Sequence, residues 1–359
     1  MSAVLLITLG LGQIIASLKG WGAASLVGPR PRLGFLLGSL LVLAGAWLLP
    51  ANPAVLWLAL PAGPLALALL LLAGSLLPPP HPNRFFQPDH PAHAGCEMLH
   101  IPDGDSRIPA CWLTPRRPIP GAGVCLIPGA GDHKTMFKHR LAAALVEAGL
   151  PLLIIDLPGH GDYRDRPMDY PDCLSVVPAV VQFMRQQGVK RLGIVGLSMG
   201  GALALNSLAE QPETARQVDA LVILETPLAF QYRRGLVRRE IWQTLRAPVL
   251  SLLGEMSLGQ IRQAWKSGGY RGRLNTSELF ARFAPRQNIG RLGDLPLLLV
   301  YSANDPIAPA EHGQALQKAA PQAELVVVRG PGHVTLTLVD MVNRQVAGWL
   351  KKRLSPEGS

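Results

Sequence analysis

One serine of this chain stands where a serine can act as a nucleophile. Ser198 lies in a Gly196-x-Ser198-x-Gly200 frame, after an apolar β-type run and before a helical run of alanine and leucine. A serine hydroxyl attacks well only when it is exposed, close to a base and faced by donors for the developing oxyanion. The frame also occurs by chance in a chain with 37 glycines. The strand before it and the helix after it predict the sharp turn that exposes a catalytic serine.

An acid and a histidine follow in that order, each after an apolar run. Asp305 ends the run 296–305 and precedes a proline, which is typical of a turn at the end of a buried strand. His333 follows the run 324–329 in a Gly-Pro-Gly-His loop. Taken alone, Asp305 would be a turn former and His333 a solvated loop residue. Their order along the chain favours His333 as a base and Asp305 as the acid that fixes its tautomer. Glu225, at the end of another apolar run, is the rival acid.

Other polar groups have plainer interpretations. Asp132 and His133 follow a glycine-rich loop and either shape the leaving-group side or are solvated, and the solvated role is favoured. A loosely metal-like spacing occurs in a proline-rich segment, among His81, His90, His93 and Cys96. Because zinc sites need fixed and closed ligation, we expect no metal there. The chain has no Gly-x-x-x-x-Gly-Lys phosphate loop and no Gly-x-Gly-x-x-Gly turn after a strand, so we expect no cofactor.

Five motifs together resemble those of the α/β-hydrolase superfamily, in its monoglyceride-lipase and esterase-like branch with a cap. They are Pro128-Gly-Ala-Gly131, Asp156-Leu-Pro-Gly-His-Gly161, Gly196-Leu-Ser-Met-Gly-Gly201, Ser302-Ala-Asn-Asp305 and Gly332-His333. The resemblance covers about residues 95–353. It implies oxyanion donors in the backbone N–H groups of Met199, after the nucleophile, and of Ala130, on the loop after the third strand. That loop often begins His-Gly in the family and begins Pro-Gly here, but a backbone donor does not require the histidine.

The pattern of elements agrees with an α/β class. Strand-like runs occur at 123–127, 152–156, 192–195, 220–225, 297–301 and 325–328. Helical patterns such as 138–148 and 174–187 lie between them. Such alternation predicts a mostly parallel sheet covered by helices on both faces, opened by an antiparallel pair near 97–101 and 108–113. We expect an α/β-hydrolase fold with a helical cap insertion, preceded by two or three transmembrane helices.

The first quarter of the chain has the composition of a membrane anchor. Residues 33–83 contain no Asp, Glu, Lys or Arg. The runs 33–50 and 54–77 can each cross about 30 Å of hydrocarbon at about 1.5 Å per residue. A shorter run, 3–18, is a third span, a signal-like segment or an interfacial helix. We expect residues 1–78 to be a transmembrane anchor, and the alternative is a helical hairpin buried in a soluble fold.

Charge and cysteine content bear on the orientation. The loop between the first two runs carries Lys19, Arg30 and Arg32 and no acid, so the positive-inside rule places it in the cytoplasm. Two further spans return the chain to the same side, which predicts a multi-pass membrane protein with a cytoplasmic catalytic domain. The four cysteines are compatible with a reducing compartment. A disulfide between Cys96 and Cys111, which could face each other in a hairpin, would contradict this orientation.

A proline-rich linker at 79–94 and a basic cap at about 228–291 complete the expected organisation. The cap holds twelve Lys or Arg, three Glu and seven aromatic residues, in a chain of formal net charge +10. It suits an anionic membrane leaflet, where each nearby cation contributes about 1 kcal/mol, or it is simply a solvated helical cap. Nucleic acid would also fit the basicity, but the expected anchor argues against it.

These features predict a membrane-anchored serine hydrolase that cleaves carboxylic esters, of lipids or other amphiphiles, through an acyl-enzyme. The expected partners are the ester substrate and membrane lipids, and no nucleic acid. An acyltransferase, a thioesterase or a peptidase would use the same three residues, because a fold does not fix a function. A non-catalytic, hydrolase-like scaffold at the membrane is the alternative that involves no enzyme.

Overall fold

The structure, a computed structural model, describes residues 2–18, 26–27, 31–48, 84–135, 139–230 and 270–356. It forms two compact units. The first comprises Met1–His81 and Pro248–Gln263, and the second comprises Pro82–Ala247 and Ala264–Ser359. The apolar run 54–77 and the middle of the expected cap lie outside the described residues.

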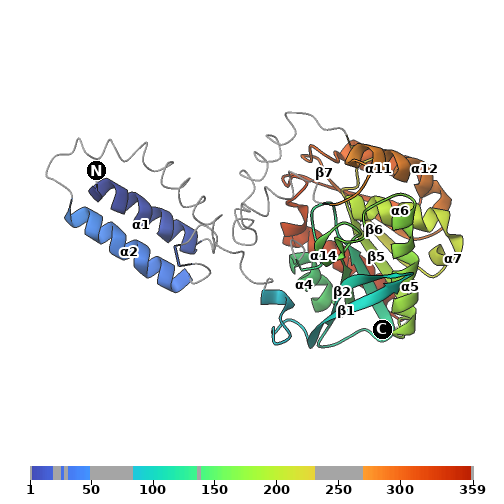
Figure 1. Cartoon of the computed structure of the whole chain (residues 1–359), viewed down its shortest axis with the longest axis horizontal. Helices are drawn as coiled ribbons and strands as arrows, with labels where there is room; N and C mark the ends of the chain where they lie inside the picture. Colours follow the sequence, from blue (N-terminus) through green and yellow to red (C-terminus); the bar gives the residue numbers. More distant parts are fainter. Residues whose placement is uncertain are drawn as a thin grey trace. The chain divides into compact units, whose positions relative to one another are not determined.

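The described part of the first unit is a pair of packed helices, α1 (Ser2–Leu18) and α2 (Pro31–Trp47) (Figure 1). Glycines allow their backbones to approach closely, because a Cβ on Gly10 would lie only 2.6 Å from the carbonyl oxygen of Gly38. Large apolar side chains remain exposed on both helices, among them Leu5, Leu11, Ile15, Phe35, Leu36, Leu40, Leu43 and Trp47. The pair therefore buries one face of each helix and leaves much apolar surface uncovered.

Each of these helices has 17 residues. Within the residues that the structure describes, no helix has both the length and the apolar character needed to cross a bilayer. The expected spans at 3–18 and 33–50 fall on α1 and α2, and the expected span at 54–77 falls outside the described part. The transmembrane spans stay a prediction.

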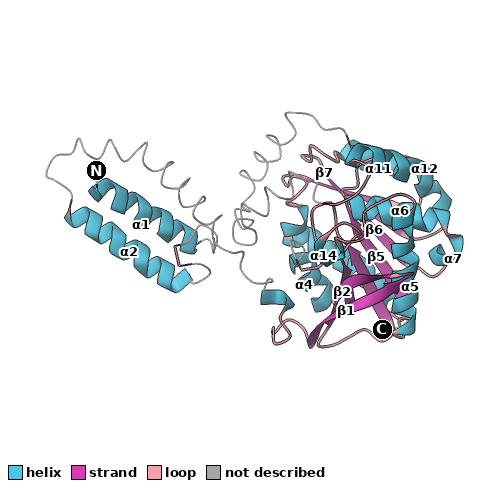
Figure 2. Ribbon diagram, in the orientation of Figure 1, coloured by secondary structure: helices cyan, strands magenta, loops and turns pink. Residues whose placement is uncertain are grey.

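An eight-stranded sheet forms the centre of the second unit, in the order β1-β2-β4-β3-β5-β6-β7-β8. Figure 2 shows its strands in magenta with helices packed beside them. Its strands are β1 (Gly95–Asp103), β2 (Ser106–Thr114), β3 (Ala122–Ile127), β4 (Leu152–Ile155), β5 (Arg191–Leu197), β6 (Ala220–Leu224), β7 (Leu297–Ser302) and β8 (Glu324–Val328). The pairs β1–β2 and β2–β4 are antiparallel, and all other neighbours are parallel. The predicted mostly parallel sheet with an antiparallel opening is confirmed.

Helices cover both faces of the sheet, as the continuous apolar strands require. Every residue of β3, β4, β6 and β7 is buried. One face packs against α5 (Val176–Gln186), α6 (Met199–Glu210) and α13 (Ala310–Ala319). The other packs against α4 (His139–Glu147) and α14 (Asp340–Leu354). The described part of the second unit also contains the shorter helices α7 (Pro212–Ala215), α11 (Thr276–Phe283), α12 (Pro285–Asn288), η3 (Arg84–Phe86), η4 (Gly161–Tyr163), η5 (Asp172–Ser175), η6 (Ile289–Leu292) and η7 (Leu336–Leu338).

The expected linker, residues 79–94, is described from residue 84 onward, and there it is packed rather than free. Phe85 and Phe86 are buried in the core cluster that contains α4 and α14. His93 is also buried, and its Nε2 lies 2.7 Å from the carbonyl oxygen of Phe85. Packing therefore begins about ten residues earlier than expected, because burial of two adjacent phenylalanines outweighs the stiffness of a proline-rich segment.

The expected cap, residues 228–291, is described at its two ends only. Its last part belongs to the core, because Phe280 and Phe283 of α11 are buried against the main sheet cluster. Two of its exposed arginines, Arg273 and Arg291, form ion pairs with Asp169 and Glu210. The bounds of the expected cap stay a prediction, because residues 231–269 lie outside the described part of the chain.

Candidate active site

Ser198 occupies a tight turn between β5 and α6. Its φ is +47°, a value that is strained for any residue other than glycine and costs about 1–3 kcal/mol. The neighbouring chain holds it there: the Ser198 N–H donates to the carbonyl of Leu224 at 2.8 Å, and the Ala202 N–H donates to the Ser198 carbonyl at 3.1 Å. The side chain is only partly buried. The turn therefore presents the hydroxyl at the carboxyl end of the sheet, as the sequence predicted.

The two glycines of the frame are required sterically. A Cβ on Gly196 would lie 2.5 Å from the Cα atom of Gly201, and a Cβ on Gly200 would lie 2.3 Å from the carbonyl oxygen of Pro128. Both contacts are closer than any real Cβ tolerates. The spacing Gly-x-Ser-x-Gly thus follows from the close approach of β5, α6 and the loop after β3.

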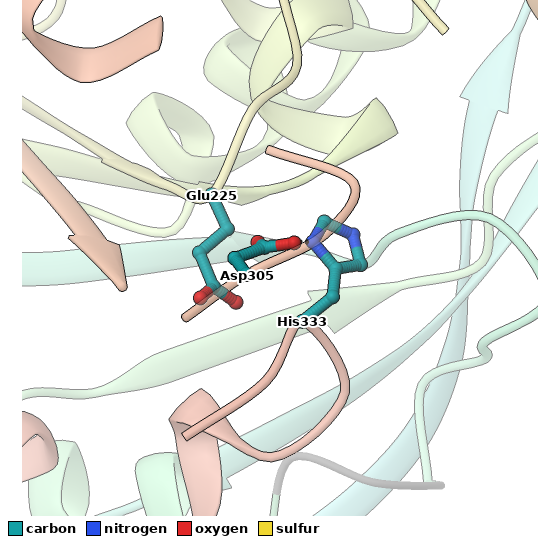
Figure 3. Close-up of side chains that lie close together, drawn as sticks. All are labelled: Glu225, Asp305 and His333. Atoms are coloured by element: carbon teal, nitrogen blue, oxygen red, sulfur yellow. Dashed lines mark hydrogen bonds and ion pairs between the residues drawn. The ribbon is translucent and has the colours of Figure 1, made fainter. Parts of the chain in front are cut away.

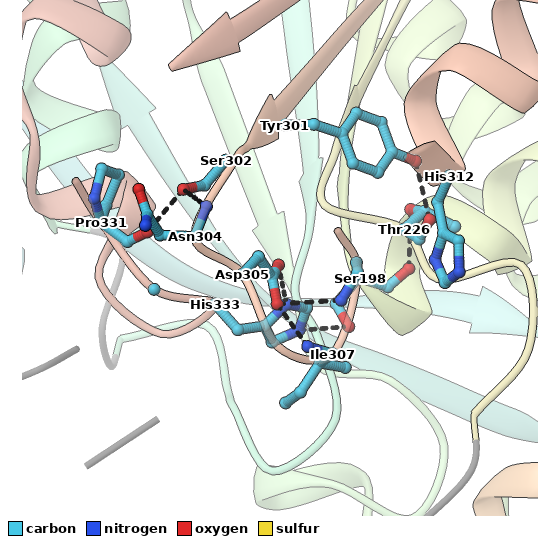
Figure 4. Close-up of polar contacts among 12 residues, drawn as sticks. Ser198, Thr226, Tyr301, Ser302, Asn304, Asp305, Ile307, His312, Pro331 and His333 are labelled. Carbon is cyan, nitrogen blue, oxygen red and sulfur yellow. Dashed lines mark hydrogen bonds and ion pairs between the residues drawn. The ribbon is translucent and has the colours of Figure 1, made fainter. Parts of the chain in front are cut away.

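His333 bridges Ser198 and Asp305 (Figure 4). Its Nε2 atom lies 2.9 Å from Ser198 Oγ, and its Nδ1 atom lies 2.6 Å from Asp305 Oδ2. The side chain of Asp305 is fully buried, while that of His333 is 13% exposed. The structure brings together all three residues that the sequence singled out, from the loops that follow β5, β7 and β8.

Asp305 is held in its ionised form. Burial alone would raise its pKa, but the His333 imidazole and two backbone N–H groups hold the pKa of this carboxyl below its usual value. These N–H groups, of Ala308 and Ile307, donate to Asp305 Oδ1 at 2.9 and 2.7 Å. A carboxylate next to Nδ1 favours the tautomer with its proton on Nδ1. The lone pair of Nε2 then faces the serine hydroxyl, which is the arrangement a general base needs.

Two hydrogen bonds tie the acid loop to the histidine loop. Ser302 Oγ donates to the carbonyl of Pro331 at 2.5 Å (Figure 4). The Gly330 N–H donates to Asn304 Oδ1 at 2.8 Å. The Ser-Ala-Asn-Asp motif, which begins at the last residue of β7, therefore positions the histidine loop as well as supplying the acid.

Glu225, the rival acid, lies beside this pair (Figure 3). It follows β6 with φ +49°, its side chain is buried, and ligand-type atoms of Glu225, Asp305 and His333 lie within 4.8 Å of one another. The 2.6 Å contact with Nδ1 is made by Asp305. Two carboxylates and an imidazole are also a metal-type donor set, but both ring nitrogens of His333 and both oxygens of Asp305 already hold hydrogen-bond partners.

The expected oxyanion donors lie on two segments that meet at the nucleophile. Met199 follows Ser198 directly and is the first residue of α6. A Cβ on Gly129, in the loop after β3, would lie 3.3 Å from the Ser198 Cβ, so this loop contacts the nucleophile. Ala130 is the next residue and is exposed. Both backbone groups are thus near Ser198, and their role as donors stays a prediction.

A buried ion pair that sequence reasoning missed anchors this oxyanion loop. Lys134 Nζ lies 2.7 Å from Asp156 Oδ2 and also contacts Asp162, while the Lys134 N–H donates to Asp156 Oδ1 at 2.7 Å. Burial would lower the pKa of Lys134, but the two carboxylates raise it above its usual value, so the pair is ionic. The available signal was an Asp at the end of one strand and a Lys after a neighbouring one.

Asp132 is not solvated, contrary to expectation. It is 4% exposed, and its Oδ1 accepts a hydrogen bond from the His133 N–H at 2.9 Å. His160 is buried too, donates through Nδ1 to the Pro158 carbonyl at 2.8 Å and stacks on Tyr270. Burial lowers the pKa of His160 to about 4, so this histidine is neutral near pH 7.

The residues with metal-like spacing bind other partners where they are described. His93 Nε2 contacts the Phe85 carbonyl, and Cys96 Sγ donates to the Phe86 carbonyl at 3.1 Å. Cys96 Sγ also lies 3.4 Å from Cys111 Sγ, and both are free thiols. The hairpin brings the two cysteines face to face without a disulfide.

A model described as the alpha/beta hydrolase family matches residues 126–347. Serine hydrolase BPHL of Mus musculus is 26% identical over 64% of this chain and 79% of its own length. A pimeloyl-(acyl-carrier protein) methyl ester esterase of Neisseria meningitidis is 26% identical over 61% of this chain and 90% of its own. The dihydrolipoyllysine-residue acetyltransferase component of the acetoin cleaving system of Pseudomonas putida is 25% identical over 65% of this chain. This chain spans 64% of that protein's length.

Solved structures show the same fold. The thermostable carboxylesterase EstE1, cloned from a metagenomic library, aligns with a TM-score of 0.52 at 18% identity, over 74% of this chain and 90% of its own. DcsB, in a complex with its substrate analogue, aligns with a TM-score of 0.54 at 18% identity, over 72% of this chain and 98% of its own. At these identities the likeness concerns the fold alone.

Proposed function

This chain belongs to the α/β-hydrolase family, and on that basis we propose that it is a membrane-anchored serine hydrolase of carboxylic esters. The observation that carries the proposal is the continuous chain of hydrogen bonds from Ser198 through His333 to Asp305. The hydroxyl, the imidazole and the carboxylate stand in the order nucleophile, base and acid, each within hydrogen-bond distance of the next. A scaffold without activity has no use for this order.

The reaction then follows from the geometry. Ser198 Oγ attacks the ester carbonyl while His333 Nε2 takes its proton, and the Asp305 carboxylate stabilises the imidazolium that forms. The N–H groups of Met199 and Ala130 bind the oxyanion of the tetrahedral intermediate. His333 returns the proton to the leaving alcohol, which leaves an acyl group on Ser198. Water, activated by the same histidine, adds to the acyl-enzyme and releases the acid.

Lipid or amphiphilic esters are the substrate class we favour, as in the monoglyceride-lipase branch. Two observations support this class: the uncovered apolar surface of α1 and α2, and the uncharged run that continues through residue 83. The basic residues of the cap would add attraction to anionic lipids. The positive charges between the first two apolar runs favour a catalytic domain on the cytoplasmic side. The relatives named as esterases support ester cleavage as the chemistry.

Acyl transfer is the second candidate function. One relative is named as an acetyltransferase component, and an alcohol or thiol that outcompetes water at the acyl-enzyme would turn the same residues into a transferase. A hydrolase and a transferase with these residues differ in the acceptor of the acyl group, and their products reveal which acceptor reacts.

Ester turnover with product analysis tests both functions. We expect the full-length protein in detergent or vesicles to release p-nitrophenol from p-nitrophenyl esters of graded chain length, with free acid as the main product. Monoacylglycerols should be cleaved as well. The same acyl donors with added glycerol would give mostly new ester if the protein is a transferase. No turnover of any ester by folded protein would contradict the proposed function.

A further inference from the structure

A threonine outside the three reacting side chains holds the backbone of the nucleophile. Thr226 lies two residues beyond the end of β6 and is fully buried. Its Oγ1 donates a hydrogen bond to the carbonyl oxygen of Ser198 at 2.9 Å. A Cβ on Gly201 would lie 2.1 Å from Thr226 Oγ1, so a glycine at this position leaves the space through which the hydroxyl reaches the turn.

Thr226 is itself fixed by the neighbouring strand. The hydroxyl of Tyr301, a fully buried residue of β7, donates to the Thr226 carbonyl at 2.7 Å (Figure 4). The residue before it, Glu225, has φ +49°, which turns the chain sharply at the end of β6. Two neighbouring strands thus set the direction of the Thr226 hydroxyl.

The Ser198 carbonyl and the Met199 N–H belong to one peptide unit. Because a trans peptide is planar, its oxygen and its hydrogen point in opposite directions, and fixing one fixes the other. We propose that Thr226 is a positioning residue, whose hydroxyl orients the Met199 N–H toward the oxyanion of the reacting ester. A hydrogen bond to the carbonyl also polarises the amide and makes its N–H a stronger donor. This inference rests on the proposed function, in which the Met199 N–H binds the oxyanion.

The Ser198 carbonyl keeps a hydrogen-bond partner when the Thr226 hydroxyl is removed. The carbonyl also accepts the Ala202 N–H at 3.1 Å. Valine has the shape of threonine without the donor, so Thr226→Val leaves no buried acceptor unpaired. The variant therefore removes the hydroxyl's constraint on the peptide plane, while the Ser198 carbonyl keeps the Ala202 N–H as a partner.

Steady-state kinetics and a transition-state analogue test the proposal together. With a p-nitrophenyl ester, we expect Thr226→Val to lower kcat about tenfold with little change in KM, since the lost interaction acts on the oxyanion. An aryl trifluoromethyl ketone adds to Ser198 Oγ and gives a tetrahedral oxyanion, so its affinity should fall by a similar factor. Thr226→Ser, which keeps the hydroxyl, should restore both. Thr214→Val, at a buried threonine of α7, is the matched control and should leave both unchanged.

The outcomes separate this proposal from the proposed function. Wild-type protein without ester turnover would contradict the function itself. An active wild type with unchanged kcat and analogue affinity in Thr226→Val would overturn the role of Thr226 alone, as would a lower kcat without a loss of analogue affinity. If Thr226→Val does not fold, Thr226→Cys takes its place, because a thiol is a weaker donor. Thr226→Cys should then lower kcat and analogue affinity in parallel, while Thr226→Ser keeps both at the wild-type level.

Discussion

His333 Nδ1 lies 2.6 Å from Asp305 Oδ2, although the two residues are 28 positions apart and lie in loops after different strands. The loops are joined by hydrogen bonds of their own, through Ser302 and Asn304. The contact therefore follows from the packing of the two loops at the carboxyl end of the sheet. It sets the tautomer of the histidine, on which proton transfer from Ser198 depends.

The choice between two acids gives the first prediction. Asp305→Asn should lower kcat for ester hydrolysis by about 10³-fold or more, because an amide at Nδ1 favours the wrong tautomer of the base. Glu225→Gln, the matched change at the neighbouring carboxylate, should lower kcat far less. Initial rates with one p-nitrophenyl ester measure both. A larger loss in Glu225→Gln than in Asp305→Asn would make Glu225 the acid.

The buried pair Lys134–Asp156 gives a prediction about stability. Lys134→Met leaves a charged Asp156 without its partner in a buried place, which should destabilise the domain by about 3–5 kcal/mol. Adding Asp156→Asn to this variant should recover part of the loss, since the orphaned charge is then gone. Thermal unfolding midpoints of the three proteins measure the effect. Equal midpoints for wild type and Lys134→Met would show that the pair contributes nothing to the fold.

His160 predicts a dependence of stability on pH. Its pKa is about 4 in the folded chain and about 6.5 when unfolded, so between these values the unfolded state binds more protons. Stability from this group should therefore be complete above about pH 6.5 and decline as the pH falls toward 4, by up to about 3 kcal/mol. His160→Asn keeps a donor near the Nδ1 position but does not titrate. Its thermal midpoint should vary less between pH 7 and pH 4 than that of wild type, and equal slopes would refute the assignment.

Membrane attachment and orientation predict a fractionation result. The full-length protein should stay with membranes after washing at high salt and alkaline pH. In sealed vesicles with the cytoplasmic face inside, an added protease should leave the catalytic domain intact, and in inverted vesicles it should degrade the domain. Release by the alkaline wash would contradict integral anchoring. Digestion in the first vesicle type would place the domain on the other side.

The sequence predicted the parts of the site that depend on local patterns. Continuous apolar runs located the strands, and the residues after them, Ser198, Asp305 and His333, meet because parallel strands end at one edge of a sheet. Asp305 and Glu225 both end apolar runs ahead of the histidine, and only side-chain geometry after packing shows which acid contacts Nδ1. The Lys134–Asp156 pair depends on the strand order β4-β3-β5, which no local pattern contains. Burial of Phe85 and Phe86 likewise depends on packing against α4 and α14, which come much later in the chain.

An activated serine is the central claim, and labelling with a fluorophosphonate probe tests it most directly. Membranes that contain wild type, Ser198→Ala, His333→Ala and the exposed-serine control Ser277→Ala should be compared at equal protein level. We expect labelling of wild type and of Ser277→Ala, and none of the two site variants. Undiminished labelling of Ser198→Ala, or no labelling of folded wild type, would contradict the account.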